Sequence, residues 1–545
     1  MTFKIYNVRF RYGLPEKVGG WQSLLTDTIV GVARKQHAFV DTDGNRYVAI
    51  GTDKFLLIYF EGQLFDITPL KADITGATIA TVDGSPTCTI TTSSAHNINV
   101  GDIVLFDSVT LPGGTGYSAS DFEDKNFQVI TVPSPTTFTI TQSTVSTGSA
   151  SGGSITLKPY EPVGPAAQSY GYGFGIGNYG GTITGAATTT VNNSGVIAAG
   201  ATSFVVTDSS VLPSTGTLLI NSELMTYSSN NTSTNTISGV TRAQGGTADV
   251  EHANGSTVTN ATDFTGFGEA VTASAVTLEP GLWSLSNFGE VLIATVLNGK
   301  TFTWNSGIAA RLTTRASTTT SGFQTTNNPT ATRSTLISPT TRHLIHFGTE
   351  TTIGSPATQD DMFIRFSADE DINQFTIEQT NTAGSQRLQD GTKIMGGLVA
   401  KENILVWTDN ALYTMKFVGA PFTFGFEQVG TNCGLIGQNA AVEIDGVAYW
   451  MGNNGFFSFD GTVNTLPCSV EDFVYDDIDT TKGQQICAGI NNLFTEVVWW
   501  YPTSGSTFNN RYVVYNYGQD NANLPMGNCF PVTITGGNVP VPELS

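Results

Sequence analysis

Charged residues are scarce in this 545-residue chain, and their scarcity limits what the chain can bind. Asp, Glu, Lys and Arg make up 13% of the sequence, about half of the ~25% that is typical of globular domains. The 45 acidic residues outnumber the 24 basic ones, so the formal net charge is −21. An acidic surface repels phosphates, which argues against binding nucleic acid by counterion release. The same charge suits a wall past which DNA must slide without adhering.

Cysteine is also rare, and its pattern argues against a disulfide framework or a zinc site. The count is odd, the spacing is wide, and no pair forms a CxxC. We therefore expect reduced and mostly buried thiols. The five are Cys88, Cys433, Cys468, Cys487 and Cys529.

Long apolar runs and familiar catalytic motifs are missing as well. No stretch of about 18 apolar residues occurs, so we expect no membrane span. The amino terminus MTFKIYNVRFRYG has no apolar core of a secretory signal. GxSxG, Walker-type and HExxH motifs are absent. We expect no enzyme activity, no cofactor, and no catalytic or metal-binding residues. A secreted-type composition without a signal fits a particle that is assembled in the cytoplasm and released by lysis.

Short strands separated by Asp-, Asn- and Gly-containing turns fill most of the chain. Phe39–Leu70 has turns at DGN, TDK and EGQ, which predicts three or four antiparallel strands. Similar units recur at Trp283–Asn305, Thr335–Leu388, Lys393–Gly419, Ala440–Gly461 and Ile486–Gly518. Four-stranded meanders repeating every ~40–50 residues are typical of propeller blades. The sequence predicts an all-β, irregular β-propeller of about six blades.

Two stretches interrupt this repeat and predict small inserted β modules. We expect an N-terminal segment and first blade at 1–72, a first module at 73–158, a linker at 159–190, a second module at 191–262, and the remaining blades with the C-terminal strands at 263–545. Within the linker, SYGYGFGIGNYGGTITG (Ser169–Gly185) is rich in Gly and Tyr and predicts a flexible loop. Insertions of this size are tolerated because loop-closure costs grow slowly with length.

The acidic clusters admit a functional and a structural interpretation. Asp41-Thr42-Asp43-Gly44 begins like a calcium loop, but Thr52 stands where the loop needs a carboxylate, so a hairpin turn is favoured. Asp369-Glu370-Asp371 and the three aspartates at Asp476, Asp477 and Asp479 could serve a glycosidase or bind a cation. Solvated turns or a channel rim are the favoured interpretation for both clusters.

The histidine pair and the aromatic residues also admit a functional and a structural interpretation. His343 and His346 are three residues apart, which places them on opposite faces of a strand and argues against a shared metal. Strand aromatics could line a sugar groove, but packing between blades is favoured. These aromatics are Trp450, Phe456, Trp499, Trp500 and Tyr501. The glycosylation-type sequence Asn231-Thr232-Ser233 carries little weight in a chain so rich in Ser and Thr.

Several segments, taken in their order, resemble the tail nozzle (tail tubular protein B-like) family of short-tailed phages. They are FRYGLPEKVGGW (Phe10–Trp21), IRFSADEDINQFTIEQTNTAGSQRLQDGTKI, ILVWTDNALYTMKFVGAP, GLIGQNAAVEIDGVAYWMGNNGFFSFDG, EVVWWYP and RYVVYNY. The resemblance covers the first ~70 residues and the chain from Trp283 onward, on the propeller plan. Family members usually continue past the last segment with a tryptophan-bearing strand, where this chain has LPMGNCFPVTITGGNVPVPELS. The inserted modules are similar to small decoration-like modules of phage tail proteins.

The resemblance implies a virion protein of the phage tail, assembled in the host cytoplasm. It implies a homo-hexameric ring at the distal end of the tail, docked on an adaptor ring and contacting fibres or spikes. The ring would retain double-stranded DNA and then conduct it through the host cell surface. The gate would be steric, and the Gly/Tyr-rich segment and blade loops are its candidates.

Two alternatives stay open at this point. One is a receptor- or carbohydrate-binding tail propeller that could depolymerise glycan, with two carboxylates ~5–10 Å apart beside aromatics. The other is a side appendage or hub component of a longer-tailed phage.

Overall fold

The chain forms two compact units, which are described separately. A computed structural model describes residues 8–11, 14–17, 29–164, 187–262, 280–318, 327–401, 403–468, 470–506, 508–519 and 529–533. Unit 1 comprises residues 1–167 and 279–545, and unit 2 comprises residues 168–278. The predicted loop at 169–185 lies outside the described residues. Among the described helices, none has the length and apolar character needed to cross a bilayer.

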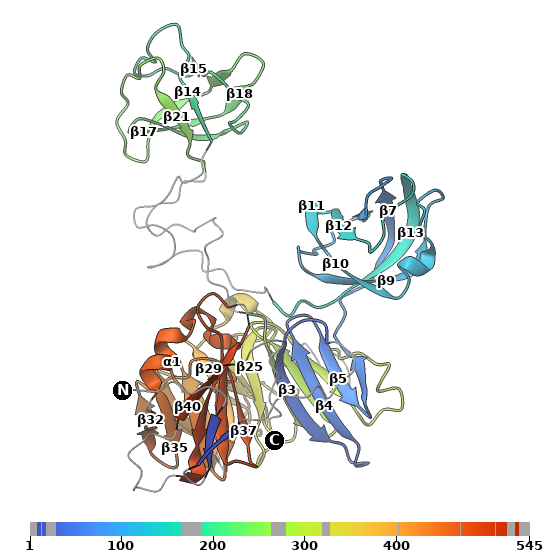
Figure 1. The fold of residues 1–545 in the computed structure, drawn as a ribbon, viewed down its shortest axis with the longest axis vertical. Helices are drawn as coiled ribbons and strands as arrows, with labels where there is room; N and C mark the ends of the chain where they lie inside the picture. Colours follow the sequence, from blue (N-terminus) through green and yellow to red (C-terminus); the bar gives the residue numbers. More distant parts are fainter. Residues whose placement is uncertain are drawn as a thin grey trace. The chain divides into compact units, whose positions relative to one another are not determined.

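Among the described residues, unit 1 contains six blade sheets, besides the sheet of an inserted module and a separate hairpin, and the expected all-β, propeller-like fold is confirmed (Figure 1). Five of the blade sheets have four strands and the second has three. In chain order the blades are β3 (Ala33–Val40), β4 (Arg46–Thr52), β5 (Leu56–Phe60), β6 (Gln63–Asp66); β22 (Trp283–Phe288), β23 (Val291–Val296), β24 (Thr301–Asn305); β25 (Thr332–Ile337), β26 (Leu344–Thr349), β27 (Phe363–Phe366), β28 (Gly384–Arg387); β29 (Ile394–Ala400), β30 (Asn403–Thr408), β31 (Ala411–Gly419), β32 (Thr423–Thr431); β33 (Ala441–Ile444), β34 (Val447–Met451), β35 (Phe456–Phe459), β36 (Val463–Thr465); and β37 (Cys487–Asn491), β38 (Glu496–Tyr501), β39 (Arg511–Asn516), β40 (Cys529–Thr533).

The turn residues explain where these strands end. Glu61 and Gly62 join β5 to β6, and both have positive φ, at 48° and 86°. Asp445 and Gly446 do the same between β33 and β34, with φ of 50° and 86°. Positive φ at both central residues defines the tight turn that matches the twist of a hairpin, and Gly tolerates it without cost. The predicted EGQ and Asp-Gly turns are therefore confirmed.

The first strand of each blade adjoins the first strand of the next blade, from β3 through β22, β25, β29 and β33 to β37. The first and last blades are linked through Asn439, which precedes β33 of the fifth blade, and we call this junction of Arg34, Asn439 and Cys487 the seam. Asn439 pairs with Cys487 in a parallel bridge. The Asn439 Nδ2 donates to the backbone oxygen of Arg34 at 3.1 Å.

Apolar side chains fill the spaces between neighbouring blades. One cluster joins the first two blades through Tyr47, Leu56, Trp283 and Trp304, and the largest cluster joins the last three blades. Buried tryptophans also link chain segments by hydrogen bonds, because an indole N–H needs an acceptor when it is buried. The Nε1 of Trp283 donates to the Thr52 oxygen at 3.0 Å, and that of Trp499 donates to the Ala440 oxygen at 3.0 Å.

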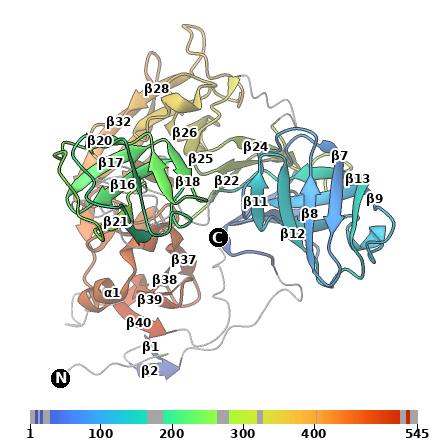
Figure 2. The same ribbon diagram turned by 90° about the horizontal axis from the view of Figure 1, so that it is seen from above.

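The last blade obtains its fourth strand from the segment in which the sequence departs from the resembled family. β40 pairs with β39 in an antiparallel register, and Figure 2 shows β37 to β40 side by side. A short helix, α1 (Glu471–Asp477), and a 3₁₀ segment (Thr480–Gln485) precede this blade. Two further 3₁₀ turns lie at Pro356–Thr358 and Tyr517–Gln519. A separate hairpin pairs β1 (Val8–Arg11) with β2 (Leu14–Lys17).

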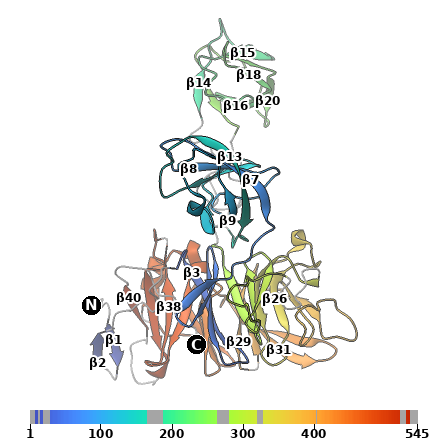
Figure 3. The ribbon, with the colours of Figure 1, turned by 90° about the vertical axis from the view of Figure 1, so that its right-hand side faces the viewer.

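The first inserted module is a seven-stranded antiparallel sheet within unit 1, and it has its own apolar core. Figure 3 shows its strands β7, β8, β9 and β13. Its strand order is β10-β9-β13-β7-β8-β12-β11, so the first and last strands of the module are central neighbours. A 3₁₀ turn lies at Ala119–Asp121. The strands are β7 (Ile74–Thr81), β8 (Thr87–Thr91), β9 (Ile103–Thr110), β10 (Lys125–Gln128), β11 (Thr131–Ser134), β12 (Thr137–Thr141) and β13 (Ala150–Pro159).

Hydrogen bonds of Tyr160, which follows the last strand of this module, hold the module against the first blade, and Arg315 Nη2 donates to the same hydroxyl at 3.0 Å. The carboxylate of Asp66 accepts from Arg315 Nη1 at 2.9 Å and from the Tyr160 hydroxyl at 2.8 Å. The two connecting segments also pair with each other through a bridge between Leu70 and Tyr160. Apolar side chains of the blade, such as Leu57, pack with Tyr160 in one cluster. The base of the inserted module is therefore fixed to the first blade by specific contacts.

Unit 2 is a small β module with a five-stranded and a three-stranded sheet. Its first described strand lies within the segment 159–190, which was predicted to be a linker. The strands are β14 (Thr188–Thr190), β15 (Ser203–Val205), β16 (Gly216–Ile220), β17 (Glu223–Tyr227), β18 (Ser229–Asn231), β19 (Thr236–Ser238), β20 (Thr241–Gln244) and β21 (Thr257–Asn260).

Candidate functional site

The Asp41–Gly44 sequence forms a hairpin turn, as expected. The carboxylate of Asp41 accepts from the backbone N–H and the side-chain amide of Asn45, both at 2.8 Å. These hydrogen bonds, together with one from the Tyr47 hydroxyl, lower the pKa of Asp41 against the opposing effect of burial. Thr52 lies fully buried in β4 and bonds to the Phe55 oxygen. The Asp41 carboxylate therefore stabilises the turn by accepting hydrogen bonds from Asn45.

The acidic cluster at 369–371 is exposed and belongs to a turn, which agrees with the favoured interpretation. Asp369 Oδ1 accepts from Thr382 Oγ1 at 2.8 Å, and Asp371 Oδ1 accepts from the Asn373 N–H at 2.8 Å. Glu370 forms an exposed ion pair with Arg342 at 2.7 Å. Each side chain thus has a local partner that fixes the turn.

The aspartates at 476–479 do not lie in a simple turn, so the expected turn was wrong, and a position at a channel rim stays a prediction. Asp476 and Asp477 end helix α1, and Asp479 caps the following 3₁₀ segment by accepting from Thr481 N. Asp477 pairs with Arg511 at 2.6 Å. Asp479 pairs with Lys482 at 2.8 Å. Two of the three carboxylates are therefore neutralised by cations in the same region.

The two histidines lie in different surroundings, as their spacing predicts. His343 contacts the rings of Phe366 and Phe424, and its Nε2 lies 3.1 Å from the hydroxyl of Thr382. His346 packs edge-on against Phe375, and neither ring nitrogen has a hydrogen-bond partner. Burial, aided by the nearby Arg365 charge, lowers the pKa of His346 to about 3. His346 is therefore a neutral core residue at physiological pH.

The aromatic residues are packing residues rather than a sugar groove. Phe456, Trp450, Trp499 and Tyr501 are fully buried in the core of the last three blades. Trp500 points to the other face of its strand and packs with a separate small cluster. Stacking on a sugar requires an accessible ring face, which these side chains do not offer.

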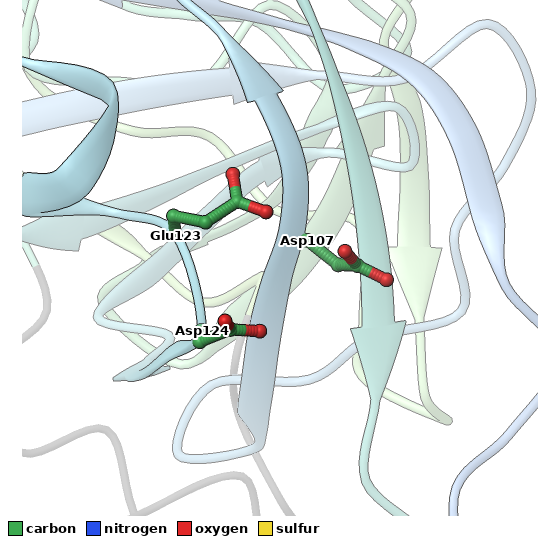
Figure 4. Close-up of side chains that lie close together, drawn as sticks. All are labelled: Asp107, Glu123 and Asp124. Atoms are coloured by element: carbon green, nitrogen blue, oxygen red, sulfur yellow. The ribbon is translucent and has the colours of Figure 1, made fainter.

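One group of carboxylates in the described residues has the geometry to hold a cation. Ligand atoms of Asp107, Glu123 and Asp124 lie within 4.8 Å of one another. Figure 4 shows the three side chains. However, Asp107 forms an ion pair with Lys158, whose hydrogen bond lowers the carboxyl pKa. The Glu123 carboxylate accepts from the N–H groups at 108 and 109, at 2.8 and 2.6 Å. These contacts give the cluster a structural role.

Unit 2 contains a buried ionic network that the sequence did not reveal. The fully buried Glu223 accepts from Arg242 Nε and Nη2 at 2.8 and 2.7 Å, and from His252 Nε2 at 2.8 Å. The backbone N–H groups of Ala243 and Val250 also donate to it, each at 3.1 Å. Burial alone would raise the pKa of Glu223, but these donors outweigh it and hold the pKa at about 2.

This network contains the residue types of a catalytic site, but its carboxylate and imidazole atoms are already occupied by hydrogen bonds within the protein. Both carboxylate oxygens of Glu223 are engaged, and the Nδ1 of His252 lies 3.2 Å from the amide nitrogen of Asn221. A general base needs a free lone pair within reach of a substrate. The network therefore pins β17, β20 and the segment at 249–252 together.

The inner strand of the first blade carries a different arrangement. A β-bulge between Ala33 and Lys35 places Arg34 as an extra residue in β3, and bulges re-aim the side chains beside them. Arg34 and Lys35 are both half-buried and lie close to the Cys487 thiol. Burial lowers the pKa of Lys35 to about 8 and raises that of Cys487 to about 12. Sequence spacing gave no sign of this cluster, because its members are about 450 residues apart on the chain.

The described cysteines are free, as expected, but only two of the four are buried. The described thiols of Cys88, Cys433, Cys468 and Cys487 are free, and the first two are buried. The side chain of Cys529 lies outside the described ones. Asn231, of the glycosylation-type sequence, is exposed at the end of β18.

Comparisons with known proteins do not assign a family. No family model matches the chain, and no curated protein matches it. Among solved structures, the chain is similar to the computationally designed Ika8 protein, at 10% identity and a TM-score of 0.25, covering 60% of this chain and 85% of that chain. It is similar to the extracellular domain of BT4673 from B. thetaiotaomicron, at 11% identity and a TM-score of 0.22, covering 98% and 79%. It is also similar to phage phi92 endosialidase, at 9% identity and a TM-score of 0.16, covering 97% and 61%. Likenesses this weak carry no argument about activity.

Proposed function

We propose that this chain is a structural subunit of the tail nozzle of a short-tailed phage. Six copies would form a ring around a channel that retains double-stranded DNA and then conducts it into the host. The ring would dock on an adaptor ring and support fibres or spikes.

One observation carries the proposal: the segments that resemble the nozzle family coincide with consecutive blades. Residues 364–394, 404–421, 434–461 and 496–517 fall on the third, fourth, fifth and sixth blades in that order. The insertions fall between the first and second blades, where they leave the radial succession of inner strands intact. An ordered match along a repeat architecture supports a shared plan more strongly than any single motif does.

The acidic net charge of the chain also supports the proposal, because a DNA channel needs a wall to which DNA does not adhere. A ring of six copies would carry six times the −21 charge of one chain. Like charge between the wall and DNA disfavours adhesion during transit, and salt screens this repulsion beyond about 8 Å under physiological conditions. The two acidic clusters singled out from the sequence are engaged in turns and ion pairs, which favours structural roles for them over glycan hydrolysis.

Mass photometry of the purified full chain tests this function, because the ring predicts a species of six times 57.7 kDa. Negative-stain images of that species should show six-fold symmetry and a central hole wide enough for double-stranded DNA. A monomer or trimer that cleaves host polysaccharide would contradict the conduit and favour the glycan-depolymerising alternative.

A further inference from the structure

The fourth blade carries a hairpin that runs past the strand beside it. β31 pairs with β30 only from Leu412 to Met415, whereas its pairing with β32 continues as far as Gly419. We call residues 416–425, which lie beyond the last pair with β30, the hairpin tip.

The hairpin tip exposes a cluster of large apolar side chains. Phe417 is 49% exposed, Val418 57% and Phe422 76%. Among the described residues, no other stretch of six carries three large apolar side chains that are exposed. Single exposed apolar residues are ordinary on protein surfaces, but a group of them marks a site of interaction.

The base of the hairpin holds these side chains in a fixed arrangement. The buried ring of Phe424 packs edge-on against Phe417 and Phe366, with ring centroids 5.9 and 4.9 Å apart. The N–H of Phe422 donates to the Gly419 oxygen at 3.2 Å, so the turn closes its own backbone hydrogen bond. A backbone that satisfies itself can leave water at a low cost in free energy.

The size and charge of the hairpin tip indicate what covers it. The exposed parts of two Phe and one Val amount to roughly 300 Å², since a whole Phe side chain offers ~150–250 Å². A stable protein interface buries about 800 Å² on each partner, so the hairpin tip is too small to hold a second copy of this chain. The net charge of −21 on each copy would oppose that contact as well. A lipid surface sets no such minimum area, because binding grows with the apolar area that is inserted.

We propose that the hairpin tip inserts Phe417, Val418 and Phe422 into the interfacial layer of a zwitterionic lipid bilayer. The tip contains no acidic residue, and its one cation, Lys416, can extend its ammonium towards the lipid phosphates. The net charge of −21 disfavours anionic lipids, so the partner is a bilayer of zwitterionic headgroups. This membrane contact goes beyond the proposed conduit and does not depend on ring formation, because the tip belongs to one chain.

The experiment measures co-flotation of the full chain with phosphatidylcholine vesicles at pH 7 and physiological salt. It compares wild type, the tip variant Val418→Ser/Phe422→Ser and a control, Leu493→Ser/Phe508→Ser. The control removes two exposed apolar side chains of the sixth blade. We expect wild type and control to float with the vesicles and the tip variant to bind about tenfold more weakly, because it inserts less apolar area. Adding phosphatidylglycerol to the vesicles should weaken the binding of wild type.

Three results would overturn the proposal. They are no binding of wild type, equal binding by the tip and control variants, and tighter binding of wild type to the anionic vesicles. A tip variant that binds vesicles like wild type but loses self-association in mass photometry would also overturn it, in favour of contact with a second copy.

A second readout covers the case in which the double variant fails to fold. Phe422→Trp keeps an aromatic side chain at the tip, and Phe508→Trp is its control. The emission that the new indole adds to that of wild type should shift to shorter wavelength when vesicles are added to Phe422→Trp, but not when they are added to Phe508→Trp. No shift in Phe422→Trp, or the same shift in both variants, would contradict insertion.

Discussion

Replacing Glu223 by Gln should unfold unit 2 at a markedly lower temperature. The substitution keeps the size of the side chain but removes the charge that Arg242 and His252 contact. The side chain of Arg242 is 6% exposed, so it would remain as a buried cation. Its other ion pair, with the partly exposed Asp249 at 3.1 Å, is retained and offsets part of the loss.

The loss of stability in Glu223→Gln can be estimated from the pKa shift of Glu223 and from the usual cost of breaking a buried ion pair, and the two estimates are similar. Lowering the pKa of Glu223 from 4.5 to about 2 corresponds to roughly 3 kcal/mol of stability at neutral pH, at about 1.36 kcal/mol per pH unit. Removing one partner of a buried ion pair typically costs about 3–5 kcal/mol, and the retained Asp249 pair favours the lower end. We therefore expect a loss of about 3 kcal/mol, as an order of magnitude.

Differential scanning calorimetry of the full chain follows the transition of unit 2, and Glu251→Gln is the control because Glu251 is exposed in the same unit. The folded pKa is depressed, so the stabilisation is present above the unfolded value of about 4.5 and is lost as pH falls towards 2. The difference between wild type and Glu223→Gln should accordingly shrink in that window. A loss below ~1 kcal/mol at pH 7, or one equal to that of the control, would refute the role of the network.

Three further outcomes can be checked. The pKa of Lys35 is lowered to about 8 from 10.5, so its protonated form costs stability below pH 8. Lys35→Met should raise stability at pH 7 in chloride, by up to ~3 kcal/mol, and chemical denaturation should show the gain fading towards pH 10. A Cβ at Gly51 would lie 2.6 Å from the Trp283 ring, so Gly51→Ala should lower the free energy of unfolding by ~1–3 kcal/mol in the same denaturation assay. Gly113→Ala is the control, because a Cβ there meets no atom within 4 Å and stability should not change. Arg315→Met removes the ion pair with Asp66 and the hydrogen bond to the Tyr160 hydroxyl beside the first inserted module, and hydrogen exchange should rise selectively in the segments at 68–73 and 158–163.

Local patterns predicted the strands and turns because both depend on neighbouring residues. The Asp445-Gly446 pair supplies two consecutive positive φ angles, and the alternation on either side supplies a strand with one apolar face. Those properties repeat from blade to blade, so the propeller-like fold followed from counting the units.

Helix α1 was missed because it is short and has no recognisable N-cap. Val470 occupies the cap position without a side-chain hydrogen bond. The acidic run at its end is typical of a turn, and contact with Arg511 rather than local preference holds Asp477 in place.

The two charged clusters escaped prediction for a different reason. Glu223, Arg242 and His252 come from segments 10 to 29 residues apart, and they are brought together by the pairing of β17 with β20 and by the bridge between Ile197 and His252. Arg34 and Lys35 are adjacent in sequence, but whether they face solvent, a carboxylate or the last blade depends on closure of the ring.

The residue order by itself determined the alternation of strands and turns, the positions of the insertions and the acidic balance of the protein. Each of these follows from short-range sterics or from simple composition. Tertiary structure alone decided which charges meet, as at the seam and around Glu223. Such pairings arise from contacts between distant strands, whose free energy depends on burial and on partners that no local stretch of sequence contains.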